Sequence, residues 1–255
     1  MKYNTLNAPN LSRAQSGAYD FQLGEYINKG FKVVTDNLGL YLGFAALWMV
    51  IYVVSQFIPV IGGLAYSFVV APTFLAGLYI VADKYDRGEH TEFADFFKGF
   101  DKLGELALMT LIQVVIVVAL MIPAIIVAVI AGVSMDGNFE GGSIGLFLLA
   151  GLLFIVPAVY AFVSWSFATF FIVFYDMQPW DAMETSRKTI GARFGMFLLL
   201  TFVAGLIGVA GALALGIGLL FTLPAAALIS YAAFKHIVGM PHQDIYQDTM
   251  SHLVD

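Results

Sequence analysis

The sequence predicts an all-α, polytopic integral membrane protein with six transmembrane helices, from its composition, its long uncharged runs and the placement of its cations. Of the 255 residues, 60% are hydrophobic and 12% are charged, and the mean hydropathy is +0.85. Soluble domains carry about 45–50% apolar and about 25% charged residues, so this composition excludes a water-soluble globule. One crossing of a bilayer needs about 20 apolar residues, and the chain holds several such stretches.

Turn residues divide the uncharged runs into six spans. The first run covers residues 37–82 and is interrupted by Pro59 and the Gly62-Gly63 pair, which favour a turn. A polar stretch at residues 134–143 separates the third span from the fourth, and Gly216 and Gly218 mark a turn in the last run. The predicted spans are residues 38–57, 61–82, 106–133 and 144–175, followed by two spans within residues 194–234.

The Lys and Arg residues lie on one side of these spans. They occur before the first span, between the second and third, between the fourth and fifth, and after the sixth. The opposite loops offer only Asp136 and Glu140 as charged residues. Because short cytoplasmic loops are enriched in Lys and Arg, both termini are predicted to be cytoplasmic. Residues 1–35 lack the apolar core of a signal peptide, so the first span is expected to be retained.

A pattern of amphipathic segment, span, turn and proline-bearing span occurs three times. The prolines of the even-numbered spans are Pro72, Pro157 and Pro224. The chain divides into a polar N-terminal segment (1–22), a single membrane domain with units at about 23–90, 91–177 and 178–240, and a cytoplasmic tail (241–255). Proline is frequent in membrane helices, so the pattern fits either chance or a threefold helical-hairpin repeat. We favour the repeat, since transporters and related folds often contain one.

The three amphipathic segments are predicted to be helices in the cytoplasmic membrane interface. The most apolar of them has four phenylalanines at the i, i+3, i+4, i+7 spacing of one helical face, namely Phe93, Phe96, Phe97 and Phe100. Trp180 lies at the start of the third segment. We expect these aromatic side chains to contact lipid, because each buried Phe gains roughly 1.5–3 kcal/mol relative to exposure.

A short motif in the third unit carries a resemblance to a known group of proteins. Residues 180–186 have the pattern W-x-A-x-x-x-S and lead into Phe194-Gly195 and a Gly-rich fifth span before Pro224. With the six-span layout, residues 23–240 resemble poorly characterised bacterial membrane proteins that are similar to the membrane domain preceding some glycerophosphodiester phosphodiesterases. The resemblance implies a bacterial inner-membrane location and no established activity, since the chain has no attached catalytic domain.

The predicted spans contain no ionisable residue, although intramembrane charges are the usual carriers of function. Gln113 is the only amide well inside a span. Two roles are open for Gln113. It contacts a substrate or lipid, or it forms a hydrogen bond with a neighbouring helix, and we favour the hydrogen bond. The chain has no Cys and therefore no cysteine nucleophile or thiolate metal site, and no catalytic residue and no cofactor are predicted. A net charge of −6 argues against a nucleic-acid partner.

The four histidines lie in predicted cytoplasmic segments. His236 and His242 are close in sequence and are followed by Asp244 and Asp248. This group either binds a metal weakly or is solvated. The spacing matches neither HExxH nor an i, i+4 pair of histidines, so we favour solvated side chains and predict no metal site.

Small residues are expected to bring helices close together. Gly39 and Gly43 form a GxxxG pair, and Gly205, Gly208 and Gly211 give the fifth span a small-residue face. Such faces permit close backbone approach either within one chain or in a homodimer, and we favour packing within the chain. The three tryptophans are expected in interfacial belts or helix packing rather than in a cofactor site.

Two classes of function fit the sequence. The first is a non-enzymatic accessory subunit or scaffold of a membrane complex, or a protein of lipid packing, with membrane lipids and another membrane complex as partners. The second is a transporter or channel for a lipid-like or apolar solute. A polar cavity at mid-membrane would favour the transporter, and a filled bundle with a flat apolar face would favour the scaffold. The lack of charged residues in the spans favours the scaffold.

Overall fold

The computed structural model describes residues 10–133, 141–213 and 216–241. In these ranges the secondary structure is helical throughout, without a strand, which confirms the all-α prediction. The predicted outer-loop residues Asp136 and Glu140 lie outside the described residues, as do His242, Asp244 and Asp248.

Six helical segments are long and apolar enough to cross a membrane, so the chain is a multi-pass membrane protein. The first segment is α3 (Leu38–Gln56), and the second joins α4 (Ile61–Ala65), the π-helix η2 (Tyr66–Val70) and α5 (Ala71–Asp86). The third and fourth contain α6 (Leu103–Val133), α7 (Gly141–Ser164) and α8 (Ala168–Tyr175), and the last two are α10 (Phe194–Leu213) and α11 (Leu219–Ile237).

Shorter helices pack around the charged ends of these spans. They are α1 (Leu11–Gln15), α2 (Leu23–Asp36), the 3₁₀-helix η3 (Phe93–Lys102) and α9 (Pro179–Gly191). Part of the polar N-terminal segment is thus built into the fold, since Ala14 of α1 is fully buried. The backbone N–H of Asn10 also donates to the carbonyl oxygen of Val238 over 3.2 Å.

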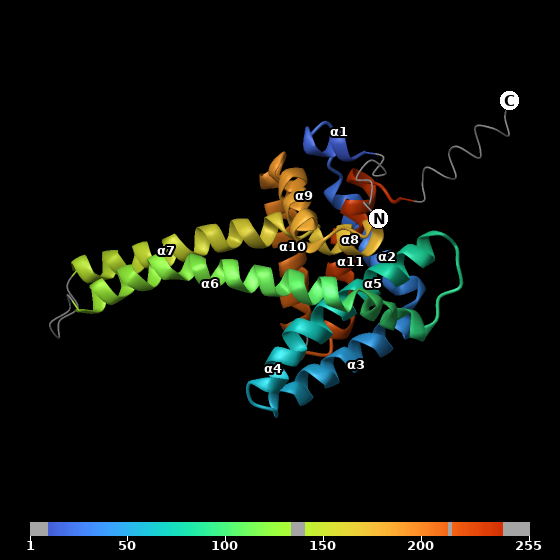
Figure 1. Cartoon of the computed structure of the whole chain (residues 1–255). Helices are drawn as coiled ribbons and strands as arrows, with labels where there is room; N and C mark the ends of the chain where they lie inside the picture. Colours follow the sequence, from blue (N-terminus) through green and yellow to red (C-terminus); the bar gives the residue numbers. More distant parts are fainter. Residues whose placement is uncertain (1–9, 134–140, 214–215, 242–255) are drawn as a thin grey trace.

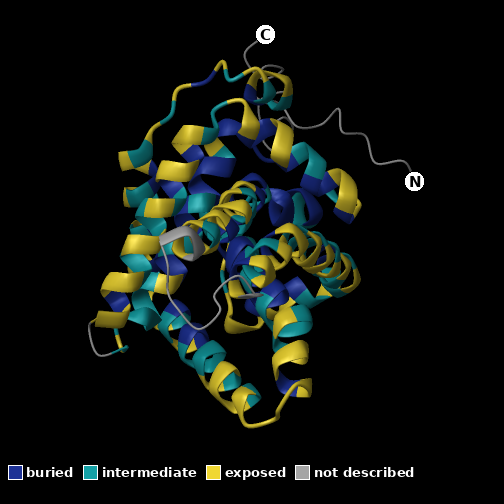
Figure 2. Ribbon diagram, turned by 90° about the vertical axis from the view of Figure 1, so that its left-hand side faces the viewer, coloured by how far each residue is buried: buried dark blue, intermediate teal, exposed yellow. Residues whose placement is uncertain are grey.

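The three helix hairpins diverge from a shared core. Figure 1 shows the α6–α7 hairpin reaching away from the rest of the molecule, while the α3–α4 hairpin runs in a different direction. The buried residues lie where the hairpins meet, and the projecting helices are largely exposed (Figure 2). With 31 residues, α6 is about 46 Å long at 1.5 Å per residue, which exceeds a hydrocarbon core of about 30 Å.

The Phe-rich segment packs inward, which corrects the expectation that all four phenylalanines contact lipid. Phe96 is fully buried, and its ring stacks on Phe44 of α3 with centroids 4.2 Å apart. Phe93 and Phe97 remain 39% and 38% exposed, and Phe100 is half-buried. The prediction assumed α-helical periodicity, in which all four residues share one face. In a 3₁₀-helix, with three residues per turn, Phe93 aligns with Phe96 and Phe97 aligns with Phe100, so the four side chains form two rows that point in different directions.

Two close helix contacts are made at Gly77 and Gly99, which were not among the predicted packing glycines. A Cβ atom on Gly77 of α5 would overlap the carbonyl of Phe96, and one on Gly99 of η3 would overlap the carbonyl of Thr73. Gly211 was predicted correctly, since a Cβ there would overlap the side chain of Thr222.

The remaining predicted packing glycines do not mediate close packing. A Cβ on Gly39, Gly205 or Gly208 would meet nothing within 4 Å, and one on Gly43 would make an ordinary contact with Phe93. The first three therefore make no close helix contact, which corrects the packing prediction, since Gly39 and Gly205 are exposed and Gly208 is only half-buried.

Candidate functional site

A network of ion pairs joins the hairpins at their charged ends. Asp86 of α5 has a side chain only 1% exposed and is paired with Lys29 of α2 and Lys235 of α11, the latter over 2.7 Å. The hydroxyl of Tyr231 also donates to Asp86, over 3.2 Å. Asp95 of η3 likewise pairs with Lys84 of α5 over 2.7 Å. The Asp86 pairs thereby join the first hairpin to the third, and the Asp95–Lys84 pair joins η3 to α5.

A second part of the charged end joins α2 to α5. The carboxylate of Asp36 accepts hydrogen bonds from Lys32, over 2.8 Å, and from the hydroxyl of Tyr85. These hydrogen bonds hold the pKa of Asp36 below its usual value. The Tyr26 hydroxyl and His236 Nδ1 are hydrogen-bonded over 2.7 Å, so His236 serves in helix packing. Within the described residues, no cluster of three or more metal-ligating side chains occurs.

The fourth span is broken between α7 and α8, and Ser186 of α9 stabilises the break. Its hydroxyl donates to the carbonyl of Ser164 over 2.6 Å and accepts from the backbone N–H of Phe167 over 3.1 Å. Ser186 and Ala182, two residues of the W-x-A-x-x-x-S motif, are fully buried. The motif therefore fixes the short helix α9 against a break in a span, and Trp180 points outward with 59% exposure.

A central cavity of about 660 Å³ is lined by residues from all six spans. Its walls include Trp48 of α3, Pro72 of α5, Gln113 of α6, Thr201 of α10 and Ser230 of α11. The fourth span contributes the residues at its break, and the second span contributes a residue of its π-helix. Irregular backbone is tolerated at membrane depth where it is buried or lines a cavity, and π-helical segments occur frequently at functional sites.

Uncharged hydrogen-bonding groups are concentrated in this cavity. The hydroxyl-bearing residues of its wall, apart from Tyr79, are Ser67, Thr110, Ser166, Thr169, Thr201 and Ser230. Thr110 donates to the carbonyl of Leu106 over 2.9 Å. For the side chains of Gln113 and the other five, no hydrogen bond is found within the described part of the chain. Polar side chains in membrane helices gain from a hydrogen-bond partner, typically by about 0.6 kcal/mol each, so a polar occupant beside these groups is favoured.

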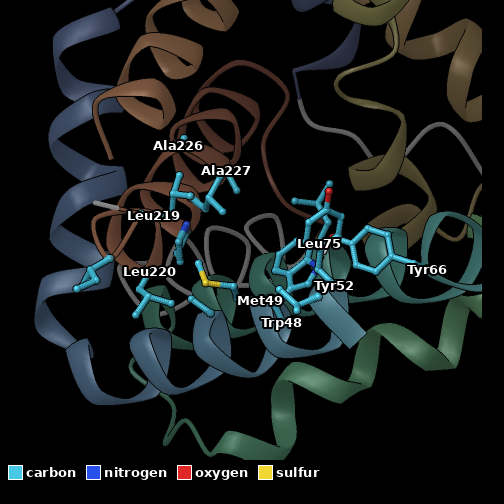
Figure 3. Close-up of a pocket in the computed structure, with 15 residues that line it drawn as sticks. Trp48, Met49, Tyr52, Tyr66, Leu75, Leu219, Leu220, Ala226 and Ala227 are labelled. Carbon is cyan, nitrogen blue, oxygen red and sulfur yellow. Dashed lines mark hydrogen bonds between the residues drawn. The ribbon is translucent and has the colours of Figure 1, made fainter. Parts of the chain in front are cut away.

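A second cavity, of about 790 Å³, adjoins the first and is predominantly apolar. The two cavities share three lining residues, Trp48, Leu75 and Ala226. Figure 3 shows Trp48, Tyr52 and Tyr66 gathered on one side of it, with Leu219 and Leu220 on the other. The Trp48 indole N–H donates to the Tyr66 hydroxyl over 3.0 Å, which fixes the indole between the two cavities.

Some of these residues were predicted from the sequence, but with other roles. Gln113 was expected to bond a neighbouring helix and instead lines the central cavity. Trp48 and Trp165 were expected in interfacial belts or packing, and both line the same cavity, as does Gly205. The serine and threonine residues were missed. Each is ordinary by itself in a membrane helix, and only their convergence from several spans marks a site.

Comparison of the chain with protein-family models, curated proteins and solved structures finds no match. The resemblance to bacterial six-span membrane proteins therefore stays a prediction. Function is accordingly inferred from the geometry of the two cavities.

Proposed function

We propose that the protein is a non-enzymatic membrane protein that binds a lipid-like amphipathic solute in its central cavity and transports it. The observation that carries this proposal is the cavity itself, to which every one of the six spans contributes a wall residue. Transporters commonly hold substrate at the interface between helix hairpins, beside discontinuous helices. The hydrogen-bonding groups in the wall of this cavity also reverse the preference drawn from the sequence, which placed the scaffold first.

The depth of the cavity supports this function. Along α6 its wall runs from Met109 to Val117, whereas the last charged residue before them is Glu105. At 1.5 Å per residue, these positions lie about 6 to 18 Å beyond that charge. A hydrocarbon core of about 30 Å has its centre about 15 Å from either face, so the wall reaches mid-membrane.

Filling the cavity is expected to abolish solute binding. Gly205 lines the cavity and has open space where a Cβ would be added, so Gly205→Leu adds volume there without a backbone clash. The probe is a long-chain alcohol with a diazirine in its alkyl chain, photolysed on the detergent-solubilised protein. We expect cavity peptides to be labelled in the wild type and labelling to fall about tenfold or more in the variant, which corresponds to about 1.4 kcal/mol.

Gly208→Leu is the matched control, because Gly208 lies one turn further along α10 and is also open, yet does not line the cavity. Its labelling should equal that of the wild type. Absence of cavity labelling in the wild type, or equal labelling in both Leu variants, would overturn the proposed function.

The second candidate function is the scaffold, and the α6–α7 hairpin favours it. Its outer part exposes apolar side chains such as Ile122, Ile126, Leu148 and Leu152, each more than half exposed. We propose this hairpin as the surface for lipid or another membrane complex. On this function, Gly205→Leu leaves the cellular role intact, whereas polar substitutions along the hairpin remove it.

We further propose a bacterial inner-membrane location, with both termini in the cytoplasm and a threefold repeat. The one-sided placement of Lys and Arg supports the orientation. The repeat is supported by the order of elements, since α2, η3 and α9 each precede a hairpin whose second helix contains a proline. Phe93, Phe97 and Trp180, which are exposed, are the side chains proposed to contact the membrane interface.

Single cysteines test the orientation, because the wild-type chain has none. Gly88→Cys and Gly137→Cys are expected to react with an impermeant thiol reagent from opposite sides of the membrane, the first from the cytoplasm and the second from outside. Gly137 lies outside the described residues and its side is predicted from the sequence. Labelling of both variants from outside the cell would contradict the six-span orientation.

A further inference from the structure

We infer that the central cavity selects a lipid with an uncharged headgroup that both donates and accepts hydrogen bonds, the chemistry of diacylglycerols and long-chain alcohols. This inference rests on the proposed function and specifies its solute. The headgroup lies against Gln113 and the neighbouring hydroxyls, and the alkyl chain extends past Trp48 into the apolar cavity.

The hydrogen-bonding groups of the cavity match such a headgroup. The Gln113 amide offers both a donor and an acceptor, and each Ser or Thr hydroxyl offers both as well. Ser166 and Thr169 face the cavity from the broken fourth span, while Thr201 and Ser230 face it from α10 and α11. A lipid hydroxyl and its ester carbonyls would satisfy groups on several hairpins at once, and an alkane would satisfy none.

Charge excludes most membrane lipids from the same position. None of the lining residues that the structure describes is Asp, Glu, Lys, Arg or His. A phosphate or a quaternary ammonium group in the cavity would be at membrane depth without a counter-charge, which is expensive for any ion. The charged side chains of the described chain are engaged instead at the ends of the helices, as in the Asp86 pairs.

The apolar cavity is suited to hold the alkyl chain of the lipid. Its wall consists mainly of aliphatic and aromatic side chains, and it meets the central cavity at Trp48, Leu75 and Ala226. Both volumes, 660 and 790 Å³, fall in the range of about 300–1,000 Å³ typical of ligand pockets. An amphipathic molecule thus finds a cavity with hydrogen-bonding groups and an apolar cavity side by side.

Competition against the diazirine alcohol on the full-length protein tests the inference. The competitors are dioctanoylglycerol, dioctanoyl phosphatidic acid and hexadecane. We expect dioctanoylglycerol to displace the probe at least about tenfold more effectively than either of the others. Gln113→Leu should weaken dioctanoylglycerol about five- to tenfold, as expected for loss of one or two hydrogen bonds, and leave hexadecane unchanged.

Gln56→Leu is the matched control, because Gln56 is an amide at the end of α3 that does not line the central cavity. Its competition profile should equal that of the wild type, and thermal melting should show that both variants are folded. Ser230→Ala provides a second, smaller change in the cavity and should weaken dioctanoylglycerol in the same direction. Equal competition by phosphatidic acid, or no effect of Gln113→Leu and Ser230→Ala, would overturn the headgroup inference while leaving the labelled cavity and the proposed function intact.

Discussion

Among the glycines of η3 and α6, Gly99 is the one whose replacement by Ala is expected to destabilise the protein most. Gly99 is buried against α5, and its new Cβ would overlap the backbone carbonyl of Thr73. Overpacking costs about 1–3 kcal/mol and occasionally more, and backbone atoms on both sides leave no flexible side chain to move aside. We therefore expect a loss of about 3 kcal/mol in the free energy of unfolding.

The loss is measurable by titrating the protein in mixed micelles with a denaturing detergent and following helix content. Gly104→Ala is the control, because Gly104 lies five residues further on at the start of α6 and a Cβ there meets nothing within 4 Å. That variant should unfold within about 0.5 kcal/mol of the wild type. Similar unfolding of the two variants would show that η3 does not pack against α5 as described.

Replacing Asp86 by Ala is expected to cost about 2–3 kcal/mol of unfolding free energy. The change removes the shared partner of Lys29 and Lys235 and leaves two ammonium groups facing each other beside Tyr231. Removing one partner of a fully buried ion pair costs about 3–5 kcal/mol. The expected loss is smaller here because the lysine side chains are 39% and 25% exposed and keep part of their hydration.

Asp101→Ala serves as the control, since Asp101 is an exposed carboxylate of η3 and its removal should change stability by less than about 0.5 kcal/mol. The double variant Asp86→Ala, Lys235→Met should be less destabilised than the sum of its single changes, because it relieves the repulsion between the ammonium groups. Additive losses would show that Asp86 and Lys235 do not interact.

The extent of the spans was predictable from the sequence because it depends on local composition. Residues 38–57 were predicted and α3 covers Leu38–Gln56, and the turn at Gly216 and Gly218 does separate α10 from α11. The break between α7 and α8 was not predicted. It covers residues 165–167, which include no proline, and the hydroxyl of Ser186, 22 residues from Ser164, donates to the carbonyl of Ser164 there.

For the glycine contacts too, the sequence predicted one part and the tertiary structure decided the other. A GxxxG spacing indicates where a helix has a small face, but whether another helix lies against that face depends on the tertiary arrangement. Gly205 and Gly208 leave open space where a Cβ would be added, whereas Gly77 and Gly99, which form no such motif with each other, meet backbone to backbone. No local pattern distinguishes the two cases.

By itself the sequence determined that this protein is helical and has six segments long and apolar enough to cross a membrane, because apolar length and the scarcity of charge act within each segment. Only the tertiary structure decided which side chains converge. Gln113, Ser67, Ser166, Thr201 and Ser230 come from five different spans and meet around one cavity. The physical reason is that a single uncharged polar group costs little in a membrane helix and leaves no trace in hydropathy, whereas the convergence of several on one cavity depends on how the spans pack.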